Sequence, residues 1–118
     1  MRILGVDPGS SATGVGVVER NGSRVVHVHH AVLRPAKAAE LSVRLDHLHR
    51  GLSSVVEEFA PEVAVVERVF IAANPRSALV LGQARGALLA CLGGGRGAGR
   101  RDRGARGQEG DHRCGRRG

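Results

Sequence analysis

The sequence predicts one domain of the α/β class, in which a mixed sheet is flanked by helices. Short apolar, β-branched runs separated by turn residues occupy the first third of the chain, at 3–7, 14–19 and 24–33. The apolar period then lengthens to three or four residues over 41–59, and another apolar run follows at 63–66. A chain of 118 residues has little room for a second domain.

The first three runs are expected to be strands joined by hairpins. The run at 3–7 ends in Asp7 and is followed by Pro-Gly-Ser-Ser at 8–11, which are turn-forming residues. The connections to the runs at 14–19 and 24–33 are short, and short connections favour antiparallel pairing.

A helix is expected over 41–59, because its large apolar residues recur at a spacing of three or four. Such residues lie on one helical face. Pro61 is expected to end this helix. The residues of that face are Leu41, Leu45, Leu48, Leu52, Val55 and Phe59.

The run VAVV at 63–66 is continuous and β-branched, which is typical of a strand buried on both faces. A second helix is expected over 75–92, with Asn74 as its N-cap and a proline in the first helical position. Gly82 and Gly86 share one face of this helix. Packing against the sheet is the favoured explanation, and a helix–helix dimer seam is the alternative.

The net charge of +7 is concentrated in the last part of the chain. Residues 1–92 hold ten Lys and Arg against eight Asp and Glu, whereas residues 93–118 hold eight Arg against three acids. A basic tail is weaker support for nucleic-acid binding than a basic folded surface. The sequence holds no apolar run long enough to cross a membrane and no signal-like segment. Cys91 lies among apolar residues and is expected to be a reduced core thiol. We therefore expect a soluble cytoplasmic protein with no membrane contact.

Residues 93–118 are expected to be a disordered Gly/Arg-rich tail, since they hold too few apolar residues to offset chain entropy. Glycine, arginine and alanine codons are GC-rich. We therefore hypothesise a frameshift near codon 92, with an RNA-binding Gly/Arg tail as the rival explanation. The nucleotide sequence decides between them, because only a frameshift predicts a family-like continuation in another frame.

Asp7 and Glu67 each follow an apolar strand. If the two strands are parallel neighbours joined by the helix at 41–59, both carboxylates lie at the same edge of the sheet. Close carboxylates repel unless a cation separates them, and Mg²⁺ prefers such oxygen ligands. For either residue alone, a turn cap or a solvated strand end is the simpler explanation. For the pair, we favour a metal site.

Two stretches carry a family resemblance, ILGVDPGSSATGVGVVE and VAVVERVFIAANPRSALVLGQARGALLA. Together they resemble the RuvC family, the crossover-junction endodeoxyribonucleases that resolve Holliday junctions in recombination and repair. The resemblance covers residues 2 to about 92. It implies a ribonuclease-H-like fold, a homodimer, Mg²⁺-dependent paired nicking of four-way junction DNA with Mn²⁺ as a substitute, and partnership with the RuvA–RuvB branch-migration complex.

The resemblance also implies roles for individual residues. Asp7 and Glu67 match metal-binding catalytic carboxylates of a two-metal hydrolysis, and Phe70 matches a position that meets the junction bases. From spacing alone, Phe70 is equally compatible with a core side chain. Arg76 and Arg85 are candidate phosphate contacts, although an arginine on a helix is more often simply solvated.

The sequence leaves the family pattern after the second helix. Family members continue through a further strand and helices that carry two more metal-binding positions, and the Gly/Arg tail does not align with these. Without that strand, the run at 63–66 is expected to be an exposed apolar edge. We expect a C-terminally truncated, catalytically incomplete and poorly folded nuclease, with a non-catalytic nucleic-acid-binding remnant as the alternative. An ATPase of the actin and sugar-kinase group is less compatible, because no second phosphate loop is present.

The histidines of the third run are a further candidate cluster. Period-two alternation places His27 and His29 on one face of the strand, with no carboxylate or cysteine positioned to complete a metal site. We therefore expect surface histidines there. The segment DHRC at 111–114 faintly resembles a metal site, but a flexible tail provides no preorganised geometry.

Overall fold

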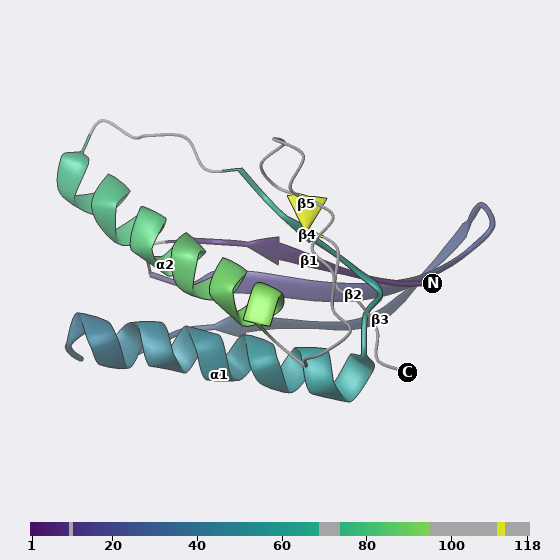
Figure 1. Ribbon diagram of the computed structural model, residues 1–118, viewed down its shortest axis with the longest axis horizontal. Helices are drawn as coiled ribbons and strands as arrows, with labels where there is room; N and C mark the ends of the chain where they lie inside the picture. The colour runs from purple at the N-terminus through teal and green to yellow at the C-terminus, as the bar shows by residue number, and fades with distance from the viewer. Residues whose placement is uncertain (10, 69–73, 95–110, 113–118) are drawn as a thin grey trace.

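The computed structural model describes residues 1–9, 11–68, 74–94 and 111–112. In chain order its elements are β1 (Arg2–Asp7), β2 (Thr13–Asn21), β3 (Arg24–Leu33), α1 (Leu41–Phe59), β4 (Val63–Val66), α2 (Pro75–Gly94) and β5 (Asp111–His112). The strands form one mixed sheet in the order β3-β2-β1-β4-β5 (Figure 1). The α/β prediction is confirmed, with strand ends differing from the expected ones by two residues at most.

The centre of the sheet is a parallel pair. β1 and β4 pair from Ile3 opposite Val63 to Val6 opposite Val66, and α1 is the crossover between them. β2 and β3 extend the sheet on the other side of β1 as antiparallel hairpins. The predicted parallel neighbours are therefore confirmed, and the C-terminal ends of β1 and β4 lie at the same edge of the sheet.

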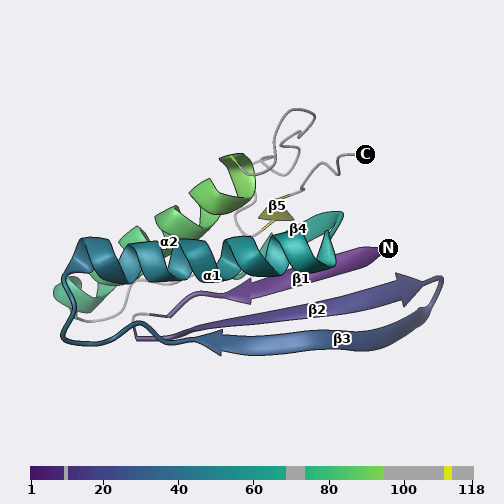
Figure 2. The ribbon, with the colours of Figure 1, turned by 90° about the horizontal axis from the view of Figure 1, so that it is seen from below.

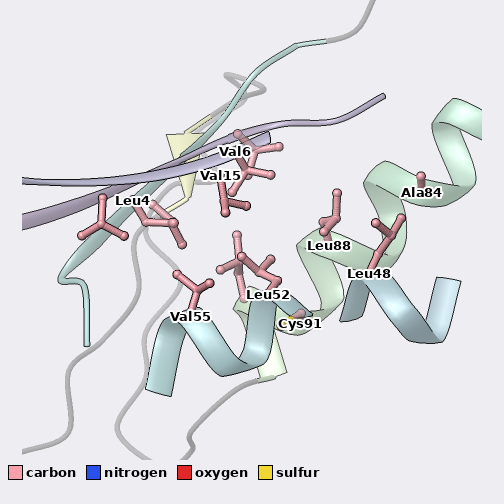
Figure 3. Close-up of a cluster of buried hydrophobic side chains, with 13 residues drawn as sticks. Leu4, Val6, Val15, Leu48, Leu52, Val55, Ala84, Leu88 and Cys91 are labelled. Carbon is pink, nitrogen blue, oxygen red and sulfur yellow. The ribbon is translucent and has the colours of Figure 1, made fainter. Parts of the chain in front are cut away.

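Both long helices lie on the same side of the sheet (Figure 2). Between the two layers lies one apolar cluster, to which the sheet contributes alternate residues of its strands (Figure 3). This alternation is expected for strands with one face on a core. The buried members are Leu4, Val6, Val15, Val17, Leu48, Leu52, Val55, Ala64, Val66, Ala84, Leu88, Cys91 and Leu92.

α1 has the bounds expected from its periodicity. Leu48, Leu52 and Val55 are buried on its sheet-facing side. The helix ends where Ala60 adopts a left-handed conformation with φ of 45°, and the Ala60 N–H donates to the Val56 carbonyl oxygen at 2.8 Å. Pro61 follows directly, so the predicted termination is confirmed.

α2 starts at the predicted cap. The Asn74 side-chain oxygen accepts hydrogen bonds from the backbone N–H groups of Arg76 at 2.9 Å and Ser77 at 3.3 Å. The helix continues to Gly94, two residues beyond the expected end. By length and composition alone it could also cross a membrane, but its buried side chains pack in the core of this domain.

The exposed face of α2 corrects one expectation. Gly82 and Gly86 are exposed, and a Cβ added at either would have no neighbouring atom within 4 Å. The favoured explanation, packing against the sheet, is therefore wrong. Leu79, one turn earlier, is 63% exposed. This side of α2, formed by Leu79 and the two glycines, is an apolar surface that no described part of the chain covers.

β5 covers part of the expected open edge. Ala64 pairs with His112, and Val65 pairs with Asp111. The sequence instead predicts a disordered segment at these two tail residues and an unpaired β4 edge. An unpaired edge strand offers a row of N–H and C=O groups to any extended segment, which gives the physical reason for this pairing.

The packing of α1 gives the first prediction. Leu52 is completely buried, whereas Val43 on the same helix is 56% exposed. Leu52→Ala should lower the free energy of unfolding by about 2–5 kcal/mol, because it leaves a cavity under the sheet. Val43→Ala should change it by less than about 0.5 kcal/mol. Urea unfolding followed by circular dichroism measures both, and equal effects would contradict the assigned core face of α1.

Candidate active site

Asp7 and Glu67 meet at the edge of the sheet where β1 and β4 end. Asp7 is the last residue of β1, and Glu67 directly follows β4. The parallel ladder continues past β4, since the Glu67 backbone N–H donates to the Val6 carbonyl oxygen at 2.8 Å. That bond fixes the Glu67 main chain beside β1. The predicted convergence of the two carboxylates is therefore present.

The turn after Asp7 requires glycine. A Cβ at Gly9 would collide with the carbonyl oxygen of Ala12. Pro8 and Gly9 thus turn the chain immediately after the carboxylate. On the neighbouring strand, Asp7 pairs with Gly14, which presents no side chain beside the carboxylate. Asp7 is exposed at this edge.

The electrostatics of the pair are those of two carboxylates in contact. The pKa of Glu67 is raised above its ordinary value of 4.5, first by a hydrogen bond to the Asp7 side chain, then by the negative charge of Asp7, and then by partial loss of solvent. Two adjacent negative charges repel, so Glu67 loses its proton less readily than an isolated glutamate. A cation between the carboxylates would remove that repulsion.

The donor set fits a hard divalent cation. Both side chains present only carboxylate oxygens, which Mg²⁺ prefers together with water and substrate phosphate. Within the ranges that the structure describes, no third His, Cys, Asp or Glu joins them in a group of three. The two carboxylates are therefore a partial ligand set that leaves most of the coordination shell to other oxygens.

One of the three candidate DNA contacts lies at this edge. Arg85 of α2 reaches the end of β4, where its Nε donates to the Glu67 carbonyl oxygen at 3.3 Å. Arg76 is exposed in the first turn of α2. Phe70 lies outside the described residues. The contact between Arg85 and the main chain of Glu67 had no signal in the sequence, because it joins residues from two different elements.

A shallow hollow of about 680 Å³ is lined by Asp7, Glu67 and residues of β1 to β4. It opens on the sheet face away from the two helices, which both lie on the other side (Figure 2). Its lining includes three glycines, which have no side chains. They are Gly5, Gly14 and Gly16, and Val18, Val65 and His30 also line the hollow.

The histidines of β3 are arranged differently from the sequence expectation. His29 stacks on Phe59 of α1, with ring centroids 4.7 Å apart, so it faces the helices. His27 contacts His30 instead. The expectation that His27 and His29 share a face is wrong, because an irregularity in the pairing of β2 with β3 interrupts the alternation.

A family model described as "Crossover junction endodeoxyribonuclease RuvC" matches residues 3–93. The chain belongs to the RuvC family. The match contains both carboxylates and all of β1 to α2 except the terminal residues Arg2 and Gly94. The resemblance read from the two sequence stretches is thereby confirmed.

Curated RuvC proteins show the same similarity. The crossover junction endodeoxyribonuclease RuvC of Geobacter sulfurreducens is 48% identical over 89 residues, covering 75% of this chain and 54% of the relative. That of Trichlorobacter lovleyi is 49% identical over 90 residues, covering 76% and 51%. The chain therefore spans about half the length of the curated relatives that it matches.

Solved structures support the fold. A structure described as T. thermophilus RuvC in complex with Holliday junction substrate aligns with a TM-score of 0.73 at 29% identity, over 78% of this chain and 56% of that one. A second Thermus thermophilus RuvC structure aligns with a TM-score of 0.68. The ribonuclease-H-like fold of the RuvC family is thus the fold of this chain.

The contact between the carboxylates gives the second prediction. Asp7→Asn removes the negative charge beside Glu67, so the pKa of Glu67 should fall toward 4.5, which carboxyl carbon NMR titration measures. The pKa of Glu67 is higher in the folded chain than in the unfolded chain. Protonation of Glu67 therefore stabilises the fold at low pH, and this contribution is lost as pH rises through the folded-state pKa. Asp46→Asn, on the exposed side of α1, is the control. An unchanged Glu67 pKa in Asp7→Asn would contradict the contact.

Proposed function

We propose that this chain is a DNA endonuclease module whose Asp7 and Glu67 hold Mg²⁺, or Mn²⁺ in its place, at four-way junction DNA. The single observation that carries the proposal is the meeting of these carboxylates at the ends of two parallel strands, with the Glu67 pKa raised by Asp7. The Thermus relative, described in complex with a Holliday junction substrate, supports the choice of DNA.

The chemistry that bound Mg²⁺ supplies in such a site is activation of water and stabilisation of the leaving 3′ oxygen. The chain's own contribution is to position the two carboxylates. Asp7 is fixed by the turn at Gly9, and Glu67 is fixed through its backbone bond to β1. Asp7 and Glu67 would hold the ion through their carboxylate oxygens, and their main chains are fixed at the edge of the sheet.

Binding of DNA is assigned to the same edge. Arg85 of α2 reaches the main chain of Glu67 at the end of β4, Arg76 is exposed in the first turn of the same helix, and their guanidinium groups suit phosphate oxygens. Phe70 is proposed to stack on an unpaired base, a contact that contributes about 1–3 kcal/mol in comparable proteins. Together these residues favour a junction backbone over a small phosphorylated substrate.

The module is proposed to be catalytically incomplete. Two carboxylates are a partial ligand set, and among the described residues no third ligand completes it. This observation favours the second candidate function, a nucleic-acid binder that does not cut. The two functions differ in one measurable property, which is metal-dependent nicking.

The nuclease proposal gives the third prediction. The purified 118-residue chain should bind a synthetic four-way junction in a gel-shift assay. With Mg²⁺ it should nick the junction at least about 100-fold more slowly than the Geobacter sulfurreducens relative, because the described residues supply only two carboxylates to the site. Asp7→Asn and Glu67→Gln should abolish the residual nicking.

Asp46→Asn is the matched control, since it removes an exposed carboxylate from α1 and should leave nicking unchanged. Nicking at the rate of the relative would contradict catalytic incompleteness. Residual nicking that survives both site variants would contradict the roles of Asp7 and Glu67. Binding with no nicking would establish the second candidate function.

A homodimer formed through α2 is also proposed, together with cytoplasmic partnership with the RuvA–RuvB complex and no membrane partner. The exposed side of α2 supports the dimer, because Leu79, Gly82 and Gly86 recur at a spacing of three or four on one face. Small residues at this spacing allow two helices to approach closely.

The dimer gives the fourth prediction. Gly86→Leu inserts a large side chain into the proposed seam and should weaken self-association by at least about tenfold, as measured by sedimentation equilibrium. Ser77→Leu adds the same side chain elsewhere on α2, at an exposed position outside the stripe, and should have no effect. Equal self-association of both variants and the parent chain would exclude this seam.

A further inference from the structure

Two exposed histidines of β3 contact each other on the uncovered face of the sheet. His27 Nε2 and His30 Nδ1 are 2.9 Å apart, and the ring centroids are separated by 5.1 Å with the planes tilted by 60°. Both side chains are exposed. The two nitrogens share a hydrogen bond, in which one ring donates and the other accepts, and nothing in the carboxylate site requires either ring.

A local irregularity in the sheet produces this contact. His29 pairs with Val17 and His27 pairs with Val18, so Val28 is an extra residue without a partner on β2. Residues three apart in a regular strand point to opposite faces. The extra residue reverses the alternation, which places His27 and His30 on the same face and turns His29 toward Phe59.

The neighbouring residues leave space above the pair. His30 pairs across the sheet with Gly16, and Gly16 pairs with Gly5. Neither glycine presents a side chain to that face, so the hollow that His30 lines remains open. A hydrated ion held by two imidazoles needs this room for its remaining water ligands.

We propose that His27 and His30 form a two-histidine site for a divalent transition-metal ion such as Ni²⁺. Metal–imidazole bonds of about 2.0–2.1 Å that meet at a right angle place the two nitrogens about 2.9 Å apart. That is the distance found here, and right angles are typical of Ni²⁺ and Cu²⁺ rather than tetrahedral Zn²⁺.

Binding of a metal ion at the neutral histidine pair need not release a proton to solvent. In the neutral pair, one of the two contacting nitrogens carries the shared proton. When the ion binds, the ring that donated moves its proton to its other nitrogen, and both contacting nitrogens then offer lone pairs to the metal. Imidazole nitrogen suits Ni²⁺ and Cu²⁺, whereas the Asp7 and Glu67 oxygens suit Mg²⁺, so the two sites select different ions.

The test, and the fifth prediction, uses Ni²⁺ alone and the full 118-residue chain in isothermal titration calorimetry. The parent chain should bind one Ni²⁺ at this pair, and His27→Gln or His30→Gln should lower the affinity at least about tenfold. The double variant should lose little more than either single variant, since one histidine alone does not chelate. Hyperfine-shifted imidazole N–H signals in proton NMR should disappear in the same variants.

His47→Gln is the matched control, because it removes an exposed histidine from α1 and should leave Ni²⁺ binding unchanged. The combined Asp7→Asn and Glu67→Gln variant should also retain it, which separates this site from the proposed nuclease site. Three results would each overturn the proposal. They are a loss of Ni²⁺ affinity in His47→Gln equal to that in the β3 histidine variants, additive losses from His27→Gln and His30→Gln, and loss of Ni²⁺ binding in the combined carboxylate variant.

Discussion

The site depends on the parallel pairing of β1 with β4. Four residue pairs, from Ile3 opposite Val63 to Val6 opposite Val66, set the register of the two strands. The backbone bond from Glu67 to Val6 extends that register by one residue, which places the Glu67 side chain beside Asp7. A slip of one residue would turn every side chain of β4 to the other face. Buried Ala64 and Val66 oppose such a slip, so the apolar core specifies the separation of two charged groups.

The crossover helix makes the pairing possible. Parallel strands need a connection of a dozen or more residues, and α1 supplies it while covering the sheet with Leu48, Leu52 and Val55. α2 covers the same face, and its Arg85 donates to the Glu67 carbonyl oxygen at the end of β4. Core packing and site geometry are thus produced by the same elements.

The sequence predicted most of the fold because its signals are local. The bounds of α1 and β4 follow from periodicity and from the positions of Pro61 and Glu67, and the Asn74 cap follows from residue type. The carboxylate pair could be predicted because it needs only two strand ends and one crossover. These features depend on short stretches of chain and one topological rule.

What the sequence could not supply depends on contacts between elements. The pairing of His27 with His30 requires a one-residue shift opposite β2, and no residue in β3 marks it. The exposed position of Gly82 and Gly86 depends on how α2 lies over α1 and the sheet, which helical spacing leaves undetermined. The pairing of β5 with β4 joins residues almost fifty positions apart, and its sequence carries no strand signal.

The exposed glycines of α2 have a consequence for the mutational history of the chain. A glycine codon becomes an alanine codon through a single base change, and a Cβ at Gly82 or Gly86 would meet no other atom within 4 Å. Each such change would stabilise the isolated helix by about 1 kcal/mol. For the single chain, alanine is therefore an accessible and favourable replacement at both positions. If a second helix packs against this face, the added methyl groups become steric obstacles, and selection for assembly would then oppose a mutation that the monomer alone would accept.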